Sequence, residues 1–299
     1  VFTKLTRPIA SRLRSRGICC VIYLDDFLIF GNSGDACSRN VSVVVQVLTS
    51  LGFLINWDKS QTIPSQRCKF SVFILDSHTM TISLPLEKRK KTLNMIRDFK
   101  SRSRCSIRAF AQFIGTLVSA CPAIKYGLMY TKASEREKFK ALRDHHMNYD
   151  TYMSRSSTLQ NDFLWWESAI QTAHNDIRFD NYDFVIYTDA SLTGWGACCD
   201  DEKTHGWWTA TESQHHINYL ELLAIAYALK SFAKYKKSCS ILIRTDNTTA
   251  LSYINRMGSI QYPALSNLAR DIWEFCEERN LWFFASYINS GKNTVADSE

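Results

Sequence analysis

Four acidic side chains in the second half of the chain stand where carboxylates can be brought together. Asp189 ends an apolar run in YTDAS, Asp246 ends another in IRTDN, Glu221 lies among leucines in NYLELLAIA, and Asp297 closes GKNTVAD. Ligands gather at the carboxyl ends of strands in sheet-and-helix folds. Because like charges held together repel, such a cluster needs cations, and oxygen ligands select Mg²⁺ or Mn²⁺.

Each of these acids also has a structural interpretation. Asp246 could cap the helix that begins beside it, and Asp189 could begin a turn. Glu221 is harder to explain in this way, since its apolar neighbours would turn the helix toward the core and push the charge toward the sheet. The order strand end, helix, strand end, final helix favours one shared site. Two ions about 4 Å apart in such a site can cleave a phosphodiester.

A second acidic feature lies near the start of the chain, in CCVIYLDDFLIFG. The apolar runs 21–24 and 27–30 predict two short strands, with Asp25 and Asp26 in the turn between them. Tight two-residue turns favour Asn-Gly or Asp-Gly, so turn geometry alone does not explain the pair. An acidic surface turn remains the structural alternative.

The charge of the chain is divided unevenly. Residues 1–150 contain 24 Lys and Arg against 11 Asp and Glu, whereas residues 151–299 contain 12 against 18. The first half is therefore +13 and the second −6. A basic half predicts a polyanionic partner, because phosphate neutralisation dominates nucleic-acid affinity.

Cysteine usage and hydropathy limit where the protein can work. The ten cysteines form no Cys-x-x-Cys pair, and several lie in apolar runs, which is typical of thiols in a reducing compartment. No apolar run approaches the ~18 to 20 residues that span a bilayer. We therefore expect an intracellular protein, cytoplasmic or nuclear and not secreted, with no membrane partner. The first residues read like the middle of a domain, so we also expect a fragment.

The spacing of apolar residues predicts three regions, 1–85, 86–180 and 181–299. The first combines a basic helix-like opening, the hairpin, a helix over 35–51, and strands over 69–75 and 80–84. The second is helical over 87–99, 107–120 and 159–173. The third follows the order βββαβααβ, which predicts a mixed five-stranded sheet covered by helices. Its strands are expected at 184–188, 194–199, 204–209, 240–245 and 281–288, and its helices at 217–232, 250–257 and 265–279.

The acidic motifs of the third region resemble the four-carboxylate signature of type 1 ribonuclease H, namely TDAS, NYLE, TDN and NTVAD. In that family the acids bind two Mg²⁺ and hydrolyse the RNA strand of an RNA/DNA hybrid. The resemblance implies the same roles for Asp189, Glu221, Asp246 and Asp297. Asn218, three residues before the glutamate, matches a position that contacts the minor groove of the hybrid.

The first region resembles the end of a reverse transcriptase palm. YLDD, with Tyr23, Asp25 and Asp26, is similar to the metal-binding hairpin, where the tyrosine lies beside the primer end. LGFLINWDKSQ, with Lys59, and KFSVFILD are similar to the segments that follow it. Together the resemblances imply the last part of a palm, a helical thumb or connection, and a ribonuclease H-like domain from a retrotransposon polyprotein. FAQFIGTLVSACPAIKYG and VADSE are most similar to DIRS-type elements.

Two departures from the polymerase family affect the expected activity. The family needs a further Asp upstream of the hairpin and a fingers domain, and this sequence contains neither, so the metal site at Asp25 and Asp26 is expected to be incomplete. A two-ion site that lacks a ligand loses both positioning and charge stabilisation. We expect ribonuclease H activity on RNA/DNA hybrids, binding to primer-template, and no primer extension. The alternative is an inactive nucleic-acid-binding remnant.

Overall fold

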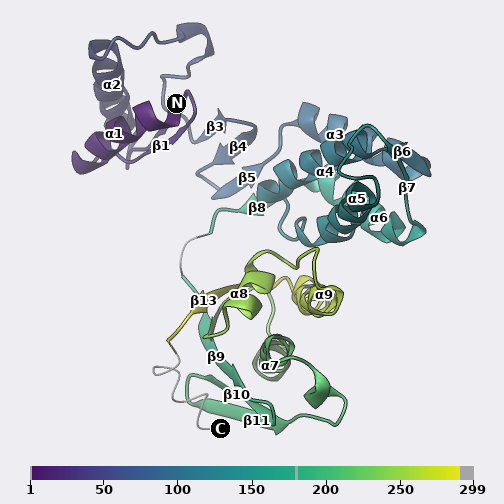
Figure 1. Cartoon of the computed structure of the whole chain (residues 1–299). Helices are drawn as coiled ribbons and strands as arrows, with labels where there is room; N and C mark the ends of the chain where they lie inside the picture. Colours follow the sequence, from purple (N-terminus) through teal and green to yellow (C-terminus); the bar gives the residue numbers. More distant parts are fainter. Residues whose placement is uncertain (1, 179–180, 290–299) are drawn as a thin grey trace. The chain divides into compact units, whose positions relative to one another are not determined.

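The computed structural model describes residues 2–178 and 181–289, and the chain forms two compact units (Figure 1). Unit 1 contains residues 1–88 and 173–177, and unit 2 contains residues 89–172 and 178–299. The predicted domain boundaries near residues 85 and 180 stay predictions. Within the described ranges, no helix has the length and apolar character that a membrane crossing requires.

Unit 1 begins with two helices packed on a hairpin. The apolar faces of the two helices and the first strand of the hairpin enclose a small core of Ile9, Leu13, Ile18, Cys20, Val44 and Leu48. Ser33 caps the second helix, because its side chain accepts from the backbone N–H of Ala36. The elements are α1 (Phe2–Ser15), β1 (Cys20–Tyr23), β2 (Asp26–Ile29) and α2 (Gly34–Ser50).

The turn of the hairpin differs by one residue from the prediction. Tyr23 pairs with Asp26, so the two turn residues are Leu24 and Asp25 rather than Asp25 and Asp26. Leu24 adopts a φ of 54°, a left-handed conformation that costs a residue with a Cβ. Asp26 therefore belongs to the second strand.

A four-stranded antiparallel sheet completes unit 1, and it corrects a second expectation. The single strand predicted over 69–75 is wrong, because a turn at Ser71, with φ of 54°, divides it into two strands. The last strand comes from far along the chain and was not predicted. In spatial order the strands are β3 (Arg67–Phe70), β4 (Phe73–Asp76), β5 (Thr81–Ser83) and β8 (His174–Asp176), and a short 3-10 helix, η1 (Trp57–Lys59), precedes them.

The helical middle of the chain packs around aromatic rings. Phe113 stacks on Phe99 with ring centroids 4.4 Å apart and meets Phe163 edge-on at 5.4 Å. These contacts join three helices, and a fourth, over 132–144, was missed by the sequence analysis. The elements are α3 (Leu86–Ser101), β6 (Arg104–Ser106), α4 (Ile107–Ala120), α5 (Lys132–Asp144), β7 (Tyr152–Ser154) and α6 (Gln160–Ala169), with 3-10 helices at Cys121–Ala123, Met129–Thr131, Ser157–Leu159 and Ile170–Thr172.

The C-terminal part of unit 2 contains the predicted mixed sheet, in the spatial order β11-β10-β9-β12-β13. The first three strands are antiparallel, whereas β12 runs parallel to both neighbours. The predicted order βββαβααβ is confirmed. The elements are β9 (Phe184–Ala190), β10 (Gly194–Cys199), β11 (Glu202–Trp207), α7 (Ile217–Phe232), β12 (Ser240–Thr245), α8 (Thr248–Asn255), α9 (Pro263–Glu278) and β13 (Trp282–Tyr287), with a 3-10 helix at Glu212–Gln214.

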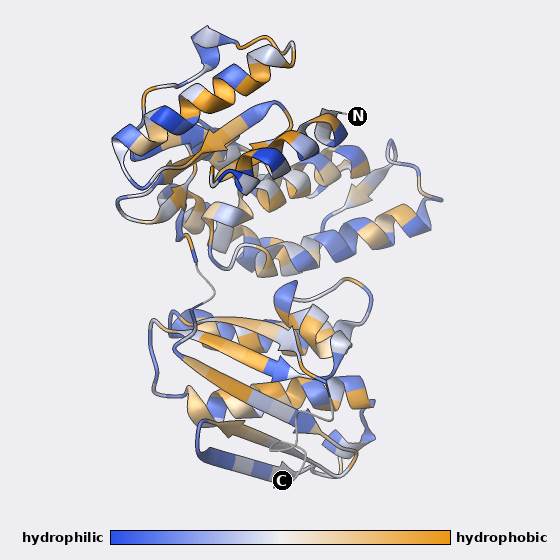
Figure 2. Ribbon diagram, turned by 90° about the vertical axis from the view of Figure 1, so that its left-hand side faces the viewer, coloured by the Kyte–Doolittle hydropathy of each residue, from blue (hydrophilic) through white to orange (hydrophobic). Residues whose placement is uncertain are grey.

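Three helices cover one face of this sheet (Figure 1). The central strands are largely hydrophobic and the edge strand β11 is hydrophilic (Figure 2). In β12, Ile241, Ile243 and Thr245 are buried and alternate with half-buried residues, the period expected of a strand with one face in the core. Trp273 of α9 stacks on Phe283 of β13 with ring centroids 4.1 Å apart, which fixes this helix on the sheet.

The helical middle and the sheet share an interface within unit 2. Glu277 of α9 accepts a hydrogen bond from the Tyr130 hydroxyl at 2.6 Å and another from Trp165 Nε1 at 2.8 Å. The rings of Tyr130 and Trp165 stack at 3.9 Å. Burial and the neighbouring Glu277 raise the pKa of Tyr130, so this phenol remains a donor. Residues of the helical middle therefore cover part of α9, the helix that packs on the sheet.

An ion pair with a buried carboxylate crosses the same interface. Arg270 of α9 donates to Asp162 of α6 at 2.8 Å and to Glu274 at 2.7 Å. The Asp162 side chain is only 2% exposed, and its burial raises the pKa of the carboxyl group while Arg270 opposes that rise. An arginine keeps its charge under all ordinary conditions. The pair therefore depends on both partners staying in place.

Removing Arg270 should destabilise the protein. In Arg270→Leu the buried Asp162 carboxylate loses its counter-charge, and breaking such a pair costs about 3–5 kcal/mol. Urea denaturation measures this free energy. The matched control is Arg143→Leu, whose ion pair with Asp144 is exposed, and it should change the stability by about 0.5 kcal/mol or less.

The deficit of Arg270→Leu should also depend on pH. Without Arg270, burial holds the pKa of folded Asp162 above its unfolded value, so the charged form penalises folding once the pH exceeds the unfolded pKa. The deficit should therefore shrink as the pH falls from about 7 to about 4. A deficit that stays constant over this range would contradict the assigned role of the pair.

Candidate metal and nucleic-acid site

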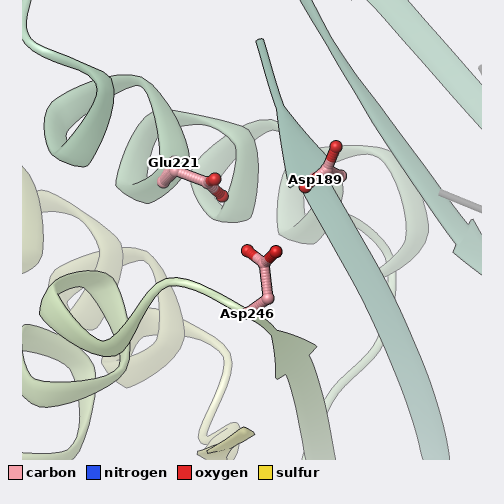
Figure 3. Close-up of side chains that lie close together, drawn as sticks. All are labelled: Asp189, Glu221 and Asp246. Atoms are coloured by element: carbon pink, nitrogen blue, oxygen red, sulfur yellow. The ribbon is translucent and has the colours of Figure 1, made fainter. Parts of the chain in front are cut away.

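Three carboxylates predicted from the sequence come together in unit 2. Asp189, Glu221 and Asp246 each offer an oxygen, and these oxygens all lie within 4.8 Å of one another. Figure 3 shows that Asp246 follows the end of a strand, Glu221 comes from a helix and Asp189 comes from a neighbouring strand. The side chains of Asp246 and Glu221 extend into the space beside Asp189. Among the described residues, this is the group of three or more such side chains that could hold a metal ion.

Strand pairing explains why the two aspartates meet. β9 and β12 are parallel neighbours, with Ile243 beside Ile186 and Arg244 beside Tyr187. Both strands therefore end at the same edge of the sheet. Asp189 is the sixth residue of β9, and Asp246 directly follows the last residue of β12. Parallel pairing thus turns two sequence-distant strand ends into neighbours.

Helix packing brings the third carboxylate to the same edge. α7 packs on β9 and β10, and its residues Leu220 and Leu222 are fully buried on either side of Glu221. Glu221 itself is only 4% exposed. A carboxylate at this depth is costly unless it is compensated by hydrogen bonds or opposite charge. The predicted orientation of this side chain toward the sheet is confirmed by its place in the cluster.

The residue after Asp246, and not Asp246 itself, caps the helix that follows. Asn247 Oδ1 accepts from the backbone N–H of Ala250 at 2.9 Å, at the start of α8. The alternative in which Asp246 serves as a cap is therefore wrong, and its carboxylate remains in the cluster. Asn247 was not singled out from the sequence, although Asn before a predicted helix is a known capping signal.

Asn218 lies beside the cluster at the start of α7. His216 caps this helix, since its Nδ1 accepts from the backbone N–H of Asn218 at 3.2 Å. The Oδ1 of Asn218 accepts from Asn247 Nδ2 at 3.0 Å. Asn218 and Glu221 are three positions apart, so they lie on the same side of the helix, about one turn from each other.

The donor set of the cluster fits a hard divalent cation. It contains carboxylate oxygens and no sulfur or imidazole, the chemistry that favours Mg²⁺, Mn²⁺ or Ca²⁺ over Zn²⁺. Three like charges at this spacing repel one another. A bound cation would relieve the repulsion, with Asp189, Glu221 and Asp246 as its protein ligands.

Four of the other predicted site residues belong to unit 1, whereas the cluster belongs to unit 2. Tyr23 is 56% exposed, and Asp25 and Asp26 are exposed with it at the hairpin of unit 1. No third His, Cys, Asp or Glu of the described residues joins the two aspartates in a comparable group. Lys59 is exposed in the 3-10 helix of unit 1. Asp297 lies outside the described residues.

Two family models match parts of the chain. Residues 180–275 match the RNase H-like domain found in reverse transcriptase. Residues 1–75 match the reverse transcriptase (RNA-dependent DNA polymerase) model. The first match contains the three clustered carboxylates, and the second contains the hairpin. These matches suggest a nucleic-acid-processing enzyme of the reverse transcriptase/RNase H type.

Curated relatives align with most of the chain. The enzymatic polyprotein of cauliflower mosaic virus (strain Strasbourg) is 26% identical over 298 residues, covering 94% of this chain and 40% of the relative. The enzymatic polyprotein of carnation etched ring virus is 26% identical over 247 residues, covering 79% of this chain and 35% of the relative. The chain thus spans about two fifths of the length of the first of these relatives.

Solved structures are similar at a lower level. A foamy viral protease-reverse transcriptase in complex with RNA/DNA hybrid has a TM-score of 0.49 and 15% identity, covering 95% of this chain and 38% of that chain. RNase H1 from the halophilic archaeon Halobacterium salinarum has a TM-score of 0.32 and 18% identity, covering 38% of this chain and 92% of that chain. The two domain matches and the polyprotein relatives together support a reverse transcriptase/ribonuclease H region of a retroelement.

Proposed function

We propose that the C-terminal part of unit 2 hydrolyses the RNA strand of RNA/DNA hybrids. The observation that carries this proposal is the cluster of Asp189, Glu221 and Asp246, whose oxygens lie within 4.8 Å of one another inside the segment that matches the RNase H-like domain. We propose Asp297 as the fourth ligand, and two Mg²⁺ or Mn²⁺ ions as the cofactors. When bound, such ions activate water and stabilise the leaving oxygen of a phosphodiester.

The protein side chains would contribute position rather than acid or base groups of their own. Glu221 is held by a buried helix, and Asp189 and Asp246 are held by paired strands, so the three oxygens keep their separation without substrate. A site of this kind gains most of its rate from preorganisation. The remaining requirement is a nucleic-acid backbone placed across the sheet edge.

Basic residues of the helical middle could hold that backbone. Lys90 and Lys91 are exposed at the start of α3, and Lys140 is exposed on α5. Other basic residues of this region are engaged in ion pairs, including Arg108 with Asp150 and Arg97 with Glu167. We propose that these exposed lysines contact the phosphates of the hybrid, an interaction that weakens steeply as salt increases.

For unit 1 we propose the last part of a reverse transcriptase palm. The match over residues 1–75 supports this assignment. Tyr23 would lie beside the primer end, Asp25 and Asp26 would supply part of a polymerase metal site, and Lys59 would contact primer-template. Completion by a further Asp and by fingers from the parent polyprotein belongs to this proposal, as do an origin in a DIRS-type element and an intracellular location, cytoplasmic or nuclear.

Metal binding can be tested without activity. Saturation with Mg²⁺ or Mn²⁺ at about 100 times its dissociation constant should stabilise the folded state by about 2.7 kcal/mol, which raises the melting temperature. Asp246→Asn should abolish this rise while leaving the metal-free melting temperature unchanged or higher, because it removes a like charge. Asp201→Asn, at an exposed acid in the β10–β11 turn, should keep the full rise. Equal rises in all three proteins would exclude the cluster as the metal site.

Cleavage of a labelled RNA/DNA hybrid tests the proposed reaction. The unmodified protein should cut the RNA strand in Mg²⁺ and leave double-stranded DNA intact. Asp189→Asn and Glu221→Gln should each lower the rate by about a thousandfold or more, equal to about 4 kcal/mol of transition-state stabilisation. Asp201→Asn should cut at the unmodified rate. If the unmodified protein binds the hybrid but leaves it uncut, the inactive remnant is the better description.

Primer extension tests the proposed state of unit 1. On a primed RNA template with dNTPs and Mg²⁺, these 299 residues should add no nucleotide, because a two-ion site that lacks a ligand loses positioning and charge stabilisation together. A full-length viral reverse transcriptase on the same template serves as the positive control. Extension that disappears in Asp25→Asn would show that the polymerase site is complete.

A further inference from the structure

The side chain of Asn247 is engaged at both ends. Its Oδ1 accepts from the backbone N–H of Ala250 at 2.9 Å, and its Nδ2 donates to Asn218 Oδ1 at 3.0 Å. Its own backbone N–H donates to Thr245 Oγ1 at 3.1 Å. These three bonds tie the end of β12, the start of α8 and the first turn of α7 to one residue.

The hydrogen-bond partners of Asn247 determine which side of its amide is the oxygen and which is the nitrogen. Oxygen and nitrogen of an asparagine amide can be told apart only from their hydrogen-bond partners. The backbone N–H of Ala250 is a donor, so it must face Asn247 Oδ1. The NH₂ group of Asn247 therefore faces Asn218. Because this group is a donor, the amide oxygen of Asn218 must accept from it.

The same logic determines what Asn218 can offer a ligand. Its oxygen is turned toward Asn247, so the other end of the amide, with the two N–H donors of Nδ2, is left for an incoming molecule. Asn218 is half-buried and precedes Glu221 by one turn on α7, and Asn247 directly follows Asp246. The pair of amides thus borders the carboxylate cluster on the side of α7 and α8.

We propose that Asn247 is a positioning residue that makes Asn218 a hydrogen-bond donor to the minor groove of the bound hybrid. This inference rests on the proposed ribonuclease H function. The minor groove offers acceptors at purine N3, at pyrimidine O2 and, on an RNA strand, at the 2′-oxygen. An Asn218 amide turned the other way would present its oxygen to these acceptors and repel them. Asn247 therefore determines that Asn218 presents its N–H donors, and not its oxygen, to the minor groove, without contacting the substrate itself.

Replacement of Asn247 by Ser separates this role from helix capping. Serine is as good an N-cap as asparagine, but its short hydroxyl is expected not to reach Asn218. Asn247→Ala removes both the cap and the contact, so it should lower the melting temperature as well as weaken binding. If Asn247 were only a cap, the serine variant would behave as the unmodified protein in every assay.

Binding is measured in the Asp189→Asn background in Mg²⁺, so that no strand is cut, by fluorescence anisotropy of a labelled RNA/DNA hybrid. Asn247→Ser should weaken binding about fivefold to tenfold, the value of one hydrogen bond, at an unchanged melting temperature. Asn218→Ala should have the same effect, and the double variant should lose no more than either single one. Hybrids with 3-deazapurines or with 2′-deoxy sugars in the RNA strand distinguish a base acceptor from a sugar acceptor. The chemical change that removes the contacted acceptor should weaken binding by the parent protein. It should leave binding by Asn247→Ser unchanged.

Several results would overturn the inference. Undiminished binding by Asn247→Ser would assign the residue to capping alone, and additive losses in the double variant would show that the two asparagines act separately. Failure of the unmodified protein to cut the hybrid would overturn the proposed function, whereas the binding series would still decide the role of Asn247. A parent protein that binds no hybrid at all would refute both.

Discussion

Repulsion among three carboxylates is the constraint around which the C-terminal sheet is built. Asp189, Glu221 and Asp246 would separate if their backbones allowed it, since like charges at this spacing disfavour one another. Two parallel strands and a buried helix hold them instead. The burial of Leu220 and Leu222 thus offsets the electrostatic cost of holding the three carboxylates close together. A cation bound by the three carboxylates would offset this repulsion and stabilise the folded state.

The helical middle is a part of this arrangement and not merely a neighbour of it. Its Tyr130 and Trp165 each donate a hydrogen bond to the carboxylate of Glu277, and its Asp162 pairs with Arg270. Without the helical middle, Glu277 would lose both of these donors and Arg270 would keep Glu274, on α9 itself, as its ion-pair partner. Because α9 also packs on β13 through Trp273, the interface supports the same sheet whose edge carries the carboxylates. Stability and site geometry are therefore linked through one helix.

Much of the C-terminal sheet could be predicted from the sequence, because its signals are local. An aspartate at the end of an apolar run and a glutamate between leucines already indicate a strand end and a buried helix, as at Asp246 and Glu221. The features that could not be predicted depend on contacts far apart in sequence or on backbone angles. The strand β8 pairs with β5 across about 90 residues, and the turn at Leu24 uses a conformation that its residue type disfavours. The link between Asn247 and Asn218 required knowledge of both helix starts in space.

The path of the chain through β8 has a consequence for dissection of the protein. Residues 173–177 belong to unit 1, although residues 89–172 before them belong to unit 2, so the chain crosses between the units more than once. A single proteolytic cut after residue 88 would leave unit 1 still bound through the ladder of β5 and β8. A fragment that starts at residue 89 would carry β8 without its partner and expose a strand edge that can recruit other chains. A fragment that begins beyond Ile177 avoids this unpaired strand, but it loses the contacts that Tyr130, Trp165 and Asp162 make with α9.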